Sequence, residues 1–451
     1  MNKGIVYIVH HVDTEGPMYE PISEIFKRLE NTLNIELKLE PTRENLHFLQ
    51  TGNVDLPDNY RQEIIKIIDP SLISFNETWK DIDKMLLRVM SKEYRNRFKD
   101  SFGNGWIYNW HIMDHVGFLT NERRRDIGYL NIFNHYEQII KETLSNDDEI
   151  QWHFHPISFN KEAHICATSY ENSSFELHQI LSRRLIEKKW FPQVNRAGFH
   201  TIRPDSNWFL EQWMPFDASN QSKIEEETIQ VDAINGRFGD WSGAPADWSI
   251  YNPDLYDWRK RGNLNRYVSR VLNLKTRFRN IDEKEIRNAF LAASKGSNVY
   301  LGITNHDFRE MSSEIENFSK MLDNVIPNFP EVKFCFSPSI KAFQSTIGYK
   351  DKEIKSNAID FDVTIKDNIL NVKIINGEPF GPQPYLAFKT ICGNYYHDNF
   401  DFGKFKKEYF YTFDRQTLKL SEIEKIGIAS NDKYGNRKVI VIDVSQKNRN
   451  N

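Results

Sequence analysis

The chain opens with a near-continuous apolar run that breaks abruptly into ionisable residues. Residues 5–9 read IVYIV, the branched, apolar pattern typical of a strand covered on both faces. The run ends in four ionisable residues ahead of a Gly-Pro turn: His10, His11, Asp13 and Glu15. In α/β folds, functional side chains gather at the carboxyl ends of parallel strands. The pattern therefore predicts a site around Asp13 and Glu15.

Strand and helix patterns then alternate for about 340 residues, which predicts a (β/α) arrangement. Helical spacing of apolar residues predicts helices at 21–29, 81–98, 129–144, 173–185 and 283–295, with another that begins at Asp205 or Ser206. Apolar runs predict strands at 106–118, 149–156, 193–199, 214–219, 299–304 and 332–336. The long polar stretch after the first helix has the pattern of an insertion, near 41–102.

One of these predicted strands carries two residues suited to binding a metal. His153 and His155 are two apart, so on an extended chain both imidazoles point the same way, about 6.6 Å apart along the strand. Asp114 and His306 fall at the ends of two other strands. Two histidines and one carboxylate are the composition of a catalytic zinc site with an open position. We therefore expect a metal centre where these strands end.

The pattern changes near residue 350. Residues 360–375 alternate polar and apolar positions around a plausible turn at Asp367 and Asn368, and residues 438–444 read KVIVIDV. Helical patterns are weak in this part. We therefore expect a barrel over residues 1–348, with the insertion near 41–102, followed by a small β-sandwich over residues 349–451.

Composition narrows the functional classes. The chain has 451 residues, 39% of them hydrophobic and 27% charged, which allows a large core and two or three domains. A net charge of −4 gives no electrostatic reason to expect nucleic acid or an anionic membrane as partner. No apolar run approaches membrane-span length, and no secretory signal precedes the first strand. Three scattered cysteines fit a reduced compartment, so we expect a cytoplasmic protein.

The motifs together resemble a known family. Asp13 and Glu15 before Gly16, the His153-x-His155 pair, an Arg196-x-Gly198 segment and a late His306 follow the order seen in polysaccharide deacetylases of the NodB-homology type. The chain more closely resembles a bacterial branch whose first motif reads VDTEG and which is associated with surface-polysaccharide gene sets. The resemblance covers residues 3–345. It implies an irregular (β/α) barrel, a carbohydrate substrate and a divalent metal, with zinc expected and cobalt or nickel as alternatives.

The resemblance also implies a role for each residue. Glu15, His153 and His155 correspond to the metal ligands, Asp13 to the base, Arg196 to the arginine that orients the base and His306 to the acid. Asp114 has no counterpart in the family pattern, and we expect it to border the site. Thr14 separates two acidic residues that are adjacent in the family, so the roles of Asp13 and Glu15 could be exchanged. The histidine pair is also more closely spaced than in the family.

Several functions agree with these patterns. The leading hypothesis is a metal-dependent deacetylase acting on an N-acylated sugar. A metal-independent glycosidase or lyase on the same barrel is the second, and a non-catalytic carbohydrate-binding protein is the third, with a homodimer through the C-terminal domain as a further expectation. Structural roles are expected for five other histidines: His10, His11, His111, His178 and His200. Most aromatic residues of the loop at 238–258 are likewise expected to pack in the core. Asp217 fits a structural or a functional role equally well.

Overall fold

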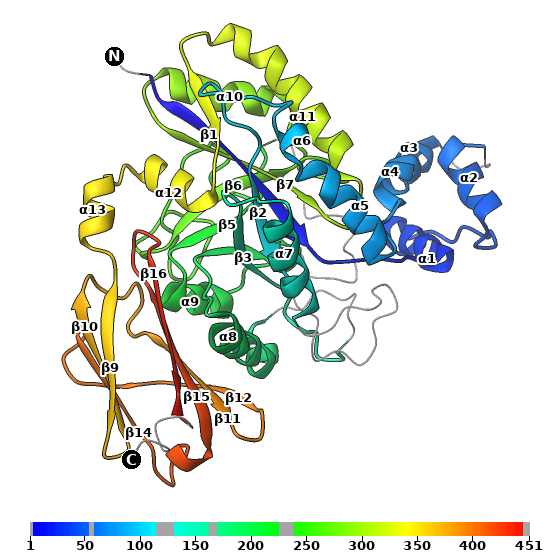
Figure 1. Cartoon of the computed structure of the whole chain (residues 1–451). Coiled ribbons are helices and arrows are strands. Elements are labelled where there is room, and N and C mark those ends of the chain that lie inside the picture. The colour runs from blue at the N-terminus through cyan, green and yellow to red at the C-terminus, as the bar shows by residue number, and fades with distance from the viewer. Residues whose placement is uncertain (1–2, 54–57, 114–129, 162–168, 225–238, 445–451) are drawn as a thin grey trace.

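The computed structural model describes residues 3–53, 58–113, 130–161, 169–224 and 239–444. Within them, seven parallel strands close into a barrel surrounded by helices, and two four-stranded antiparallel sheets follow (Figure 1). The predicted α/β class and parallel barrel are confirmed. No helix of these residues combines the length and the apolarity that crossing a membrane requires.

The barrel closes through its first strand. Its strands are β1 (Ile5–Thr14), β2 (Tyr108–Ile112), β3 (Glu149–Phe154), β4 (Val194–Ala197), β5 (Phe216–Asn220), β6 (Tyr267–Asn273) and β7 (Val299–His306). One edge of β1 pairs with β7, whereas the other pairs first with β8 (Lys333–Phe336), up to Ile8, and then with β2 from His10 onward. Because β8 ends at that point, β2 can join β1 and close the barrel.

Helices cover the outside of the barrel and plug one end. The outer helices are α5 (Trp79–Val89), α6 (Lys92–Arg95), α7 (Asn131–Glu142), α8 (Ser174–Lys188), α9 (Pro204–Trp213), α10 (Glu283–Ser294) and α11 (Met311–Val325). Helix α12 (Ser339–Ile347) contributes Ala342 and Phe343 to a buried cluster that includes Val9, Val194 and Phe216, near the amino ends of the strands. The apolar end of the barrel is thereby filled, which leaves polar side chains at the carboxyl end.

A separate helical cluster is inserted after β1. Helices α1 (Ile22–Leu33), α2 (Arg43–Thr51), α3 (Asp58–Ile67) and α4 (Pro70–Ile73) share a small core of their own and lie to one side of the barrel (Figure 1). The cluster thus runs from Ile22 to Ile73, which differs from the expected 41–102. The reason is that α5 packs on the barrel and α11, where Ile82, Met85 and Leu86 join the main core.

The last hundred residues form two antiparallel sheets. Their strands are β9 (Asp360–Lys366), β10 (Ile369–Asn376), β11 (Tyr385–Thr390), β12 (Tyr395–Asp398), β13 (Asp401–Phe402), β14 (Glu408–Thr412), β15 (Ile423–Asn431) and β16 (Arg437–Asp443), preceded by α13 (Asp351–Ser356). The orders are β13-β14-β10-β9 and β12-β11-β15-β16, and residues of both sheets share one core. The predicted turn at Asp367 and Asn368 is confirmed, since both have the positive φ that a tight hairpin requires.

The second sheet packs against the barrel. Its strands β11, β12 and β15 contact α8, and the Tyr385 hydroxyl donates to the backbone oxygen of His178 at 3.3 Å. Tyr385, Ala387 and Ala429 belong to the main core. The antiparallel sheets are therefore joined to the barrel by a shared apolar interface as well as by the chain.

The sequence patterns did not predict one of the barrel strands, β6. Strand β6 reads YVSRVLN, in which Arg270 and Asn273 interrupt the apolar run. Arg270 is buried because its guanidinium bonds both carboxylate oxygens of Glu285, at 2.7 and 2.8 Å, and stacks on Trp248. Tertiary partners thus allow a polar residue in a strand that local sequence does not mark as buried.

Candidate active site

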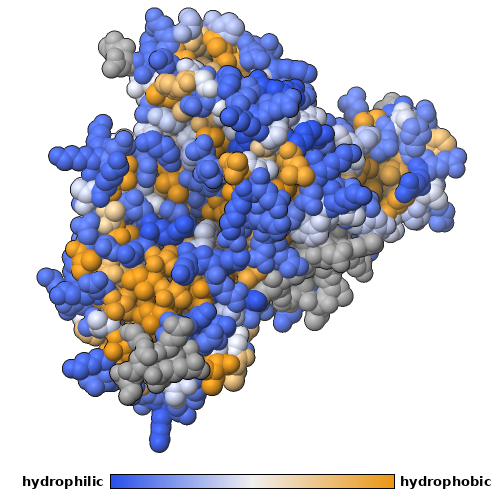
Figure 2. Space-filling model, viewed as in Figure 1, coloured by the Kyte–Doolittle hydropathy of each residue, from blue (hydrophilic) through white to orange (hydrophobic). Residues whose placement is uncertain are grey.

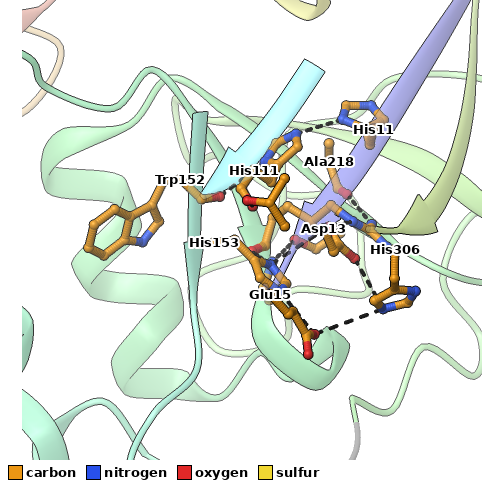
Figure 3. Close-up of polar contacts among 12 residues, drawn as sticks. His11, Asp13, Glu15, His111, Trp152, His153, Ala218 and His306 are labelled. Carbon is orange, nitrogen blue, oxygen red and sulfur yellow. Dashed lines mark hydrogen bonds and ion pairs between the residues drawn. The ribbon is translucent and has the colours of Figure 1, made fainter. Parts of the chain in front are cut away.

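The carboxyl ends of four barrel strands bring the candidate residues together. Glu15 directly follows β1, which contains Asp13, and His155 directly follows β3, which contains His153. In the parallel register Asp13 lies opposite His306 of β7, and His153 lies opposite Arg196 of β4. Figure 3 shows Asp13, Glu15, His153 and His306 pointing toward one another. This is the edge of the barrel at which α/β barrels hold their functional side chains.

Three of these residues form a group with the composition of a metal site. One ligand atom each from Glu15, His153 and His155 lies within 4.8 Å of the other two. The His155 and His153 Nε2 atoms are 2.9 Å apart, and Glu15 Oε1 lies 3.5 Å from the first and 3.9 Å from the second. Tetrahedral zinc with ligands at about 2.1 Å requires ligand atoms about 3.4 Å apart. The donor set and its spacing therefore fit a zinc-sized ion.

The tautomer of His153 suits this role. Its Nδ1 lies 2.9 Å from the backbone oxygen of Arg196, which can only accept, so Nδ1 carries the proton. The other ring nitrogen, Nε2, faces Glu15 and His155 and is the atom available to a metal. Metal-binding histidines are generally oriented by such a hydrogen bond from the other ring nitrogen.

The turn after β4 holds the second histidine. A Cβ atom on Gly198 would lie 2.5 Å from the His155 ring and 2.6 Å from the Phe154 backbone oxygen, so only glycine fits. Phe199 and His200 both adopt positive φ, at 51° and 55°, and the Phe199 ring packs edge-on against His155 at 4.3 Å. Strained backbone of this kind is concentrated at functional sites. Here it keeps the His155 ring in place.

Asp13 is a buried carboxylate paired with a buried arginine. Arg196 Nε donates to Asp13 Oδ1 at 2.6 Å, and its Nη1 donates to the Ala218 backbone oxygen at 3.0 Å. Burial by itself would raise the pKa of Asp13, but Arg196 and then His153 hold that pKa well below its ordinary value. Asp13 is therefore ionised, and its Oδ2 is buried with no hydrogen-bond partner among the described residues.

His306 faces the same space from β7. Its Nε2 lies 3.8 Å from Asp13 Oδ2 and 4.0 Å from Glu15 Oε1. Burial lowers the pKa of His306 well below 6.5, against the opposing effect of Asp13. A neutral imidazole and an ionised carboxylate thus face each other beside the group of Glu15, His153 and His155.

Asp307 orients Glu15, a role that the sequence patterns did not reveal. Its Oδ1 accepts the Glu15 backbone N–H at 2.8 Å, and its Oδ2 accepts the Gly16 N–H at 3.0 Å and the Tyr136 hydroxyl at 2.9 Å. Gly16 has a φ of 74°, which lets the chain turn immediately after Glu15. The only sequence signal for Asp307 was its position directly after His306 at a strand end.

A chain of neutral polar groups lies deeper in the barrel. His111 Nδ1 donates to the Trp152 backbone oxygen at 3.1 Å, so its Nε2 accepts from His11 Nδ1 at 2.7 Å. His11 Nε2 in turn accepts from the Tyr300 hydroxyl at 2.9 Å. Burial lowers the pKa of His111 to about 3, so these rings stay neutral. They link β1, β2, β3 and β7 beneath the site, in agreement with the structural role expected for them.

The remaining sequence candidates lie elsewhere or outside the described residues. Asp114 falls outside the described residues. Phe216 faces the barrel interior, so the next residue, Asp217, points away from it. The carboxylate of Asp217 lies beside Asn195 and Arg266 instead. The tryptophans of the loop at 239–258 are buried, which favours packing over an exposed sugar platform: Trp241, Trp248 and Trp258.

Comparisons of this chain with protein-family models, with curated proteins and with solved structures find no match. The fold and the site by themselves define a parallel α/β-barrel protein with a candidate metal centre at the carboxyl ends of its strands. Its chemistry is therefore argued from the side chains of that centre.

Proposed function

We propose that this protein is a metal-dependent hydrolase that removes an N-acyl group, such as acetyl, from a sugar of a bacterial surface polysaccharide or its precursor. The observation that carries the proposal is the convergence of Glu15, His153 and His155 next to the Asp13–Arg196 pair and His306. The order of these residues along the chain, which resembles that of NodB-type deacetylases, supports the same reaction.

The residues present fit a divalent ion, with zinc the expected metal. Glu15, His153 and His155 would hold it, and a bound ion of this kind supplies a Lewis acid that polarises an acyl carbonyl and acidifies water. Two imidazoles and one carboxylate leave a coordination position open, as catalytic zinc sites do. Cobalt or nickel would fit the same donors.

The other side chains supply the proton transfers. Hydrolysis adds water across the amide, so that a C–O bond forms, the C–N bond breaks and the amine must gain a proton. Asp13 is ionised and its Oδ2 has no hydrogen-bond partner among the described residues, so it can accept the proton that water loses. His306 Nε2 lies 3.8 Å from that oxygen, so the neutral ring can receive the proton that Asp13 took from water and pass it to the leaving amine.

The proposal predicts a bound metal that depends on both histidines. Protein purified without chelator is expected to contain about one zinc or similar ion per chain by elemental analysis. His153→Ala and His155→Ala should both lose it, since each removes one of three donors. His47→Ala, at an exposed position on α2, is the matched control and should keep it. N-acetylated sugars should then release acetate with the parent protein and with His47→Ala, and not with His153→Ala or His155→Ala.

An opposite result would be decisive. A parent chain that holds no metal even after incubation with zinc, cobalt or nickel would refute the metal-dependent hydrolase. Activity that cleaves glycosidic bonds and survives chelation would instead favour the glycosidase alternative, in which two carboxylates perform the reaction.

The orientation of Glu15 by Asp307 gives a second prediction. Asp307→Asn replaces one acceptor oxygen by an amide donor, so the Glu15 and Gly16 N–H groups can no longer both be bonded. We expect zinc affinity to fall by about 10- to 100-fold, the usual effect of losing a group that orients a ligand. Competition with a chromophoric chelator measures it directly.

Tyr136→Phe provides the graded control for Asp307. It removes the hydrogen bond from the Tyr136 hydroxyl to that carboxylate, leaves the bonds from the Glu15 and Gly16 N–H groups, and should weaken zinc binding by less than Asp307→Asn does. Unchanged zinc affinity in Asp307→Asn would show that Asp307 does not position Glu15, whereas a parent chain that binds no zinc would instead remove the metal site itself.

A further inference from the structure

The strained turn after β4 ends in a histidine that a second segment of the chain holds in place. His200 has a φ of 55°, in the left-handed region that residues other than glycine rarely adopt. Its backbone oxygen accepts a hydrogen bond from Trp241 Nε1 at 2.9 Å. A Cβ atom on Gly239 would lie 1.5 Å from the same oxygen, so only glycine fits there. The chain thus fixes His200 in a conformation that costs energy, which is typical of functional sites.

The ring of His200 makes no hydrogen bond within the described part of the chain. Its Nδ1 is buried without a partner, although the residue as a whole is partly exposed. The structural histidines deeper in the barrel differ, because His10, His11 and His111 each bond through both ring nitrogens. Buried polar groups nearly always have partners, so one that lacks them requires an explanation. A structural role does not explain His200.

Other polar atoms at the candidate site are unpartnered in the same way. Asp13 Oδ2, Arg196 Nη2 and His306 Nδ1 are buried and have no hydrogen-bond partner among the described residues. These three residues and Arg279 are the charged or titratable groups that act most strongly on His200. Burial, and then Arg196, lower the pKa of His200 well below its ordinary value, so the ring is neutral. Polar atoms grouped in this way are suited to bind a polar molecule.

The sugar part of the proposed substrate fits the position of His200 better than the acyl group does. The acyl carbonyl belongs with the candidate metal ligands Glu15, His153 and His155, whereas the leaving amine belongs with His306, one of the groups that act on His200. In the view of Figure 2, a broad hydrophobic area lies where Figure 1 places the antiparallel sheets, away from the carboxyl end of β1. The site thus offers polar side chains to a polar ligand, with His200 on the side of the amine.

We propose that His200 binds the sugar of the proposed substrate: its Nε2 forms a hydrogen bond with a hydroxyl group next to the N-acyl group that is removed. This inference rests on the proposed function and assigns a residue that determines substrate specificity. A neutral imidazole nitrogen and a hydroxyl group can each donate or accept a hydrogen bond, so the two are complementary. His200 thereby has a binding role instead of the structural one expected for an isolated histidine.

Variants of different length test this contact. His200→Gln places an amide group near the position of Nε2, whereas His200→Asn is too short to reach it and His200→Gly has no side chain. Glycine and asparagine tolerate a positive φ best, so both short variants can keep the backbone conformation. For an N-acetylated amino sugar, we expect both to raise KM about 3- to 10-fold with kcat unchanged, the effect of losing one hydrogen bond to the substrate. His200→Gln should recover most of the affinity.

An analogue without hydroxyl groups tests the same contact from the side of the ligand. N-cyclohexylacetamide keeps the amide and a six-membered ring, so its inhibition constant should be equal in the parent and in His200→Asn. The sugars to compare are N-acetylglucosamine, N-acetylgalactosamine and N-acetylmannosamine, by acetate release and by titration calorimetry on the zinc-loaded protein. His47→Asn, at an exposed position on α2, is the control and should keep the KM of the parent.

The outcomes separate this inference from the proposed function. If the parent releases acetate and both short variants keep its KM, His200 does not bind the sugar, and the deacetylase stands. If His200→Gln is no better than the short variants while its zinc content and circular dichroism match the parent, the ring acts by packing and the hydrogen bond is refuted. A parent that contains metal but neither binds nor hydrolyses any of the three sugars would overturn both.

Discussion

Replacing Asp13 by asparagine is expected to lower the rate of acyl-group release by about 10²- to 10⁴-fold, the usual contribution of a general base. Asparagine keeps the size of the side chain and can still accept the hydrogen bond from Arg196 Nε, but it cannot take a proton from water. The measurement is steady-state release of acetate from an N-acetylated sugar, with the metal content of the variant determined on the same sample.

The metal content decides which carboxylate touches the ion. Asp13→Asn should retain about one ion per chain, because the group of converging ligand atoms consists of Glu15, His153 and His155. Glu15→Gln is the matched variant and should lose the ion. If Asp13→Asn loses the metal and Glu15→Gln keeps it, the two acidic residues have exchanged roles, as their spacing around Thr14 allows.

The second large effect concerns the stability of the buried ion pair. Arg196→Met should lower the free energy of unfolding by about 3–5 kcal/mol, the cost of leaving the partner charge buried and unpaired. Asp13 is 1% exposed and the Arg196 side chain is fully buried, so water cannot replace the missing guanidinium. Chemical denaturation followed by circular dichroism measures the change.

Two further variants separate this effect from a general loss of packing. Asp13→Asn combined with Arg196→Met should be more stable than Arg196→Met alone, since no buried charge is left without a partner. Arg97→Met breaks an exposed pair with Glu316 and should cost no more than about 1 kcal/mol. An Arg196→Met protein as stable as the parent would show that the pair does not stabilise the barrel.

Much of the barrel was predictable because its strands are marked by local patterns. The opening strand and its cluster of ionisable residues are read directly from residues 5–15. Outside the barrel, β9 and β10 follow in the same way from alternation around Asp367 and Asn368. Strand β6 was missed because Arg270 is buried through Glu285, a residue on α10. Local hydrophobicity cannot reveal a strand whose polar residues are neutralised by distant partners.

The candidate site divides in the same way. The sequence indicated that His153 and His155 project from one side of a strand, since side chains two apart share a face. It could not show that their Nε2 atoms approach to 2.9 Å, because this depends on the Gly198 turn that holds His155. The sequence also could not show that Asp307 orients Glu15, because its hydrogen-bond partners, the Glu15 and Gly16 N–H groups, lie almost three hundred residues earlier.

The sequence by itself determined the class of the fold, the strands that end in ionisable residues and the residue types from which a metal site could be built. These features follow from periodicity and composition, which are local. The tertiary structure alone decided how β1 closes the barrel through β8 and β2 and which carboxylate joins the two histidines. Each of these depends on contacts between residues far apart in the chain, and such contacts form only when the strands have taken their register.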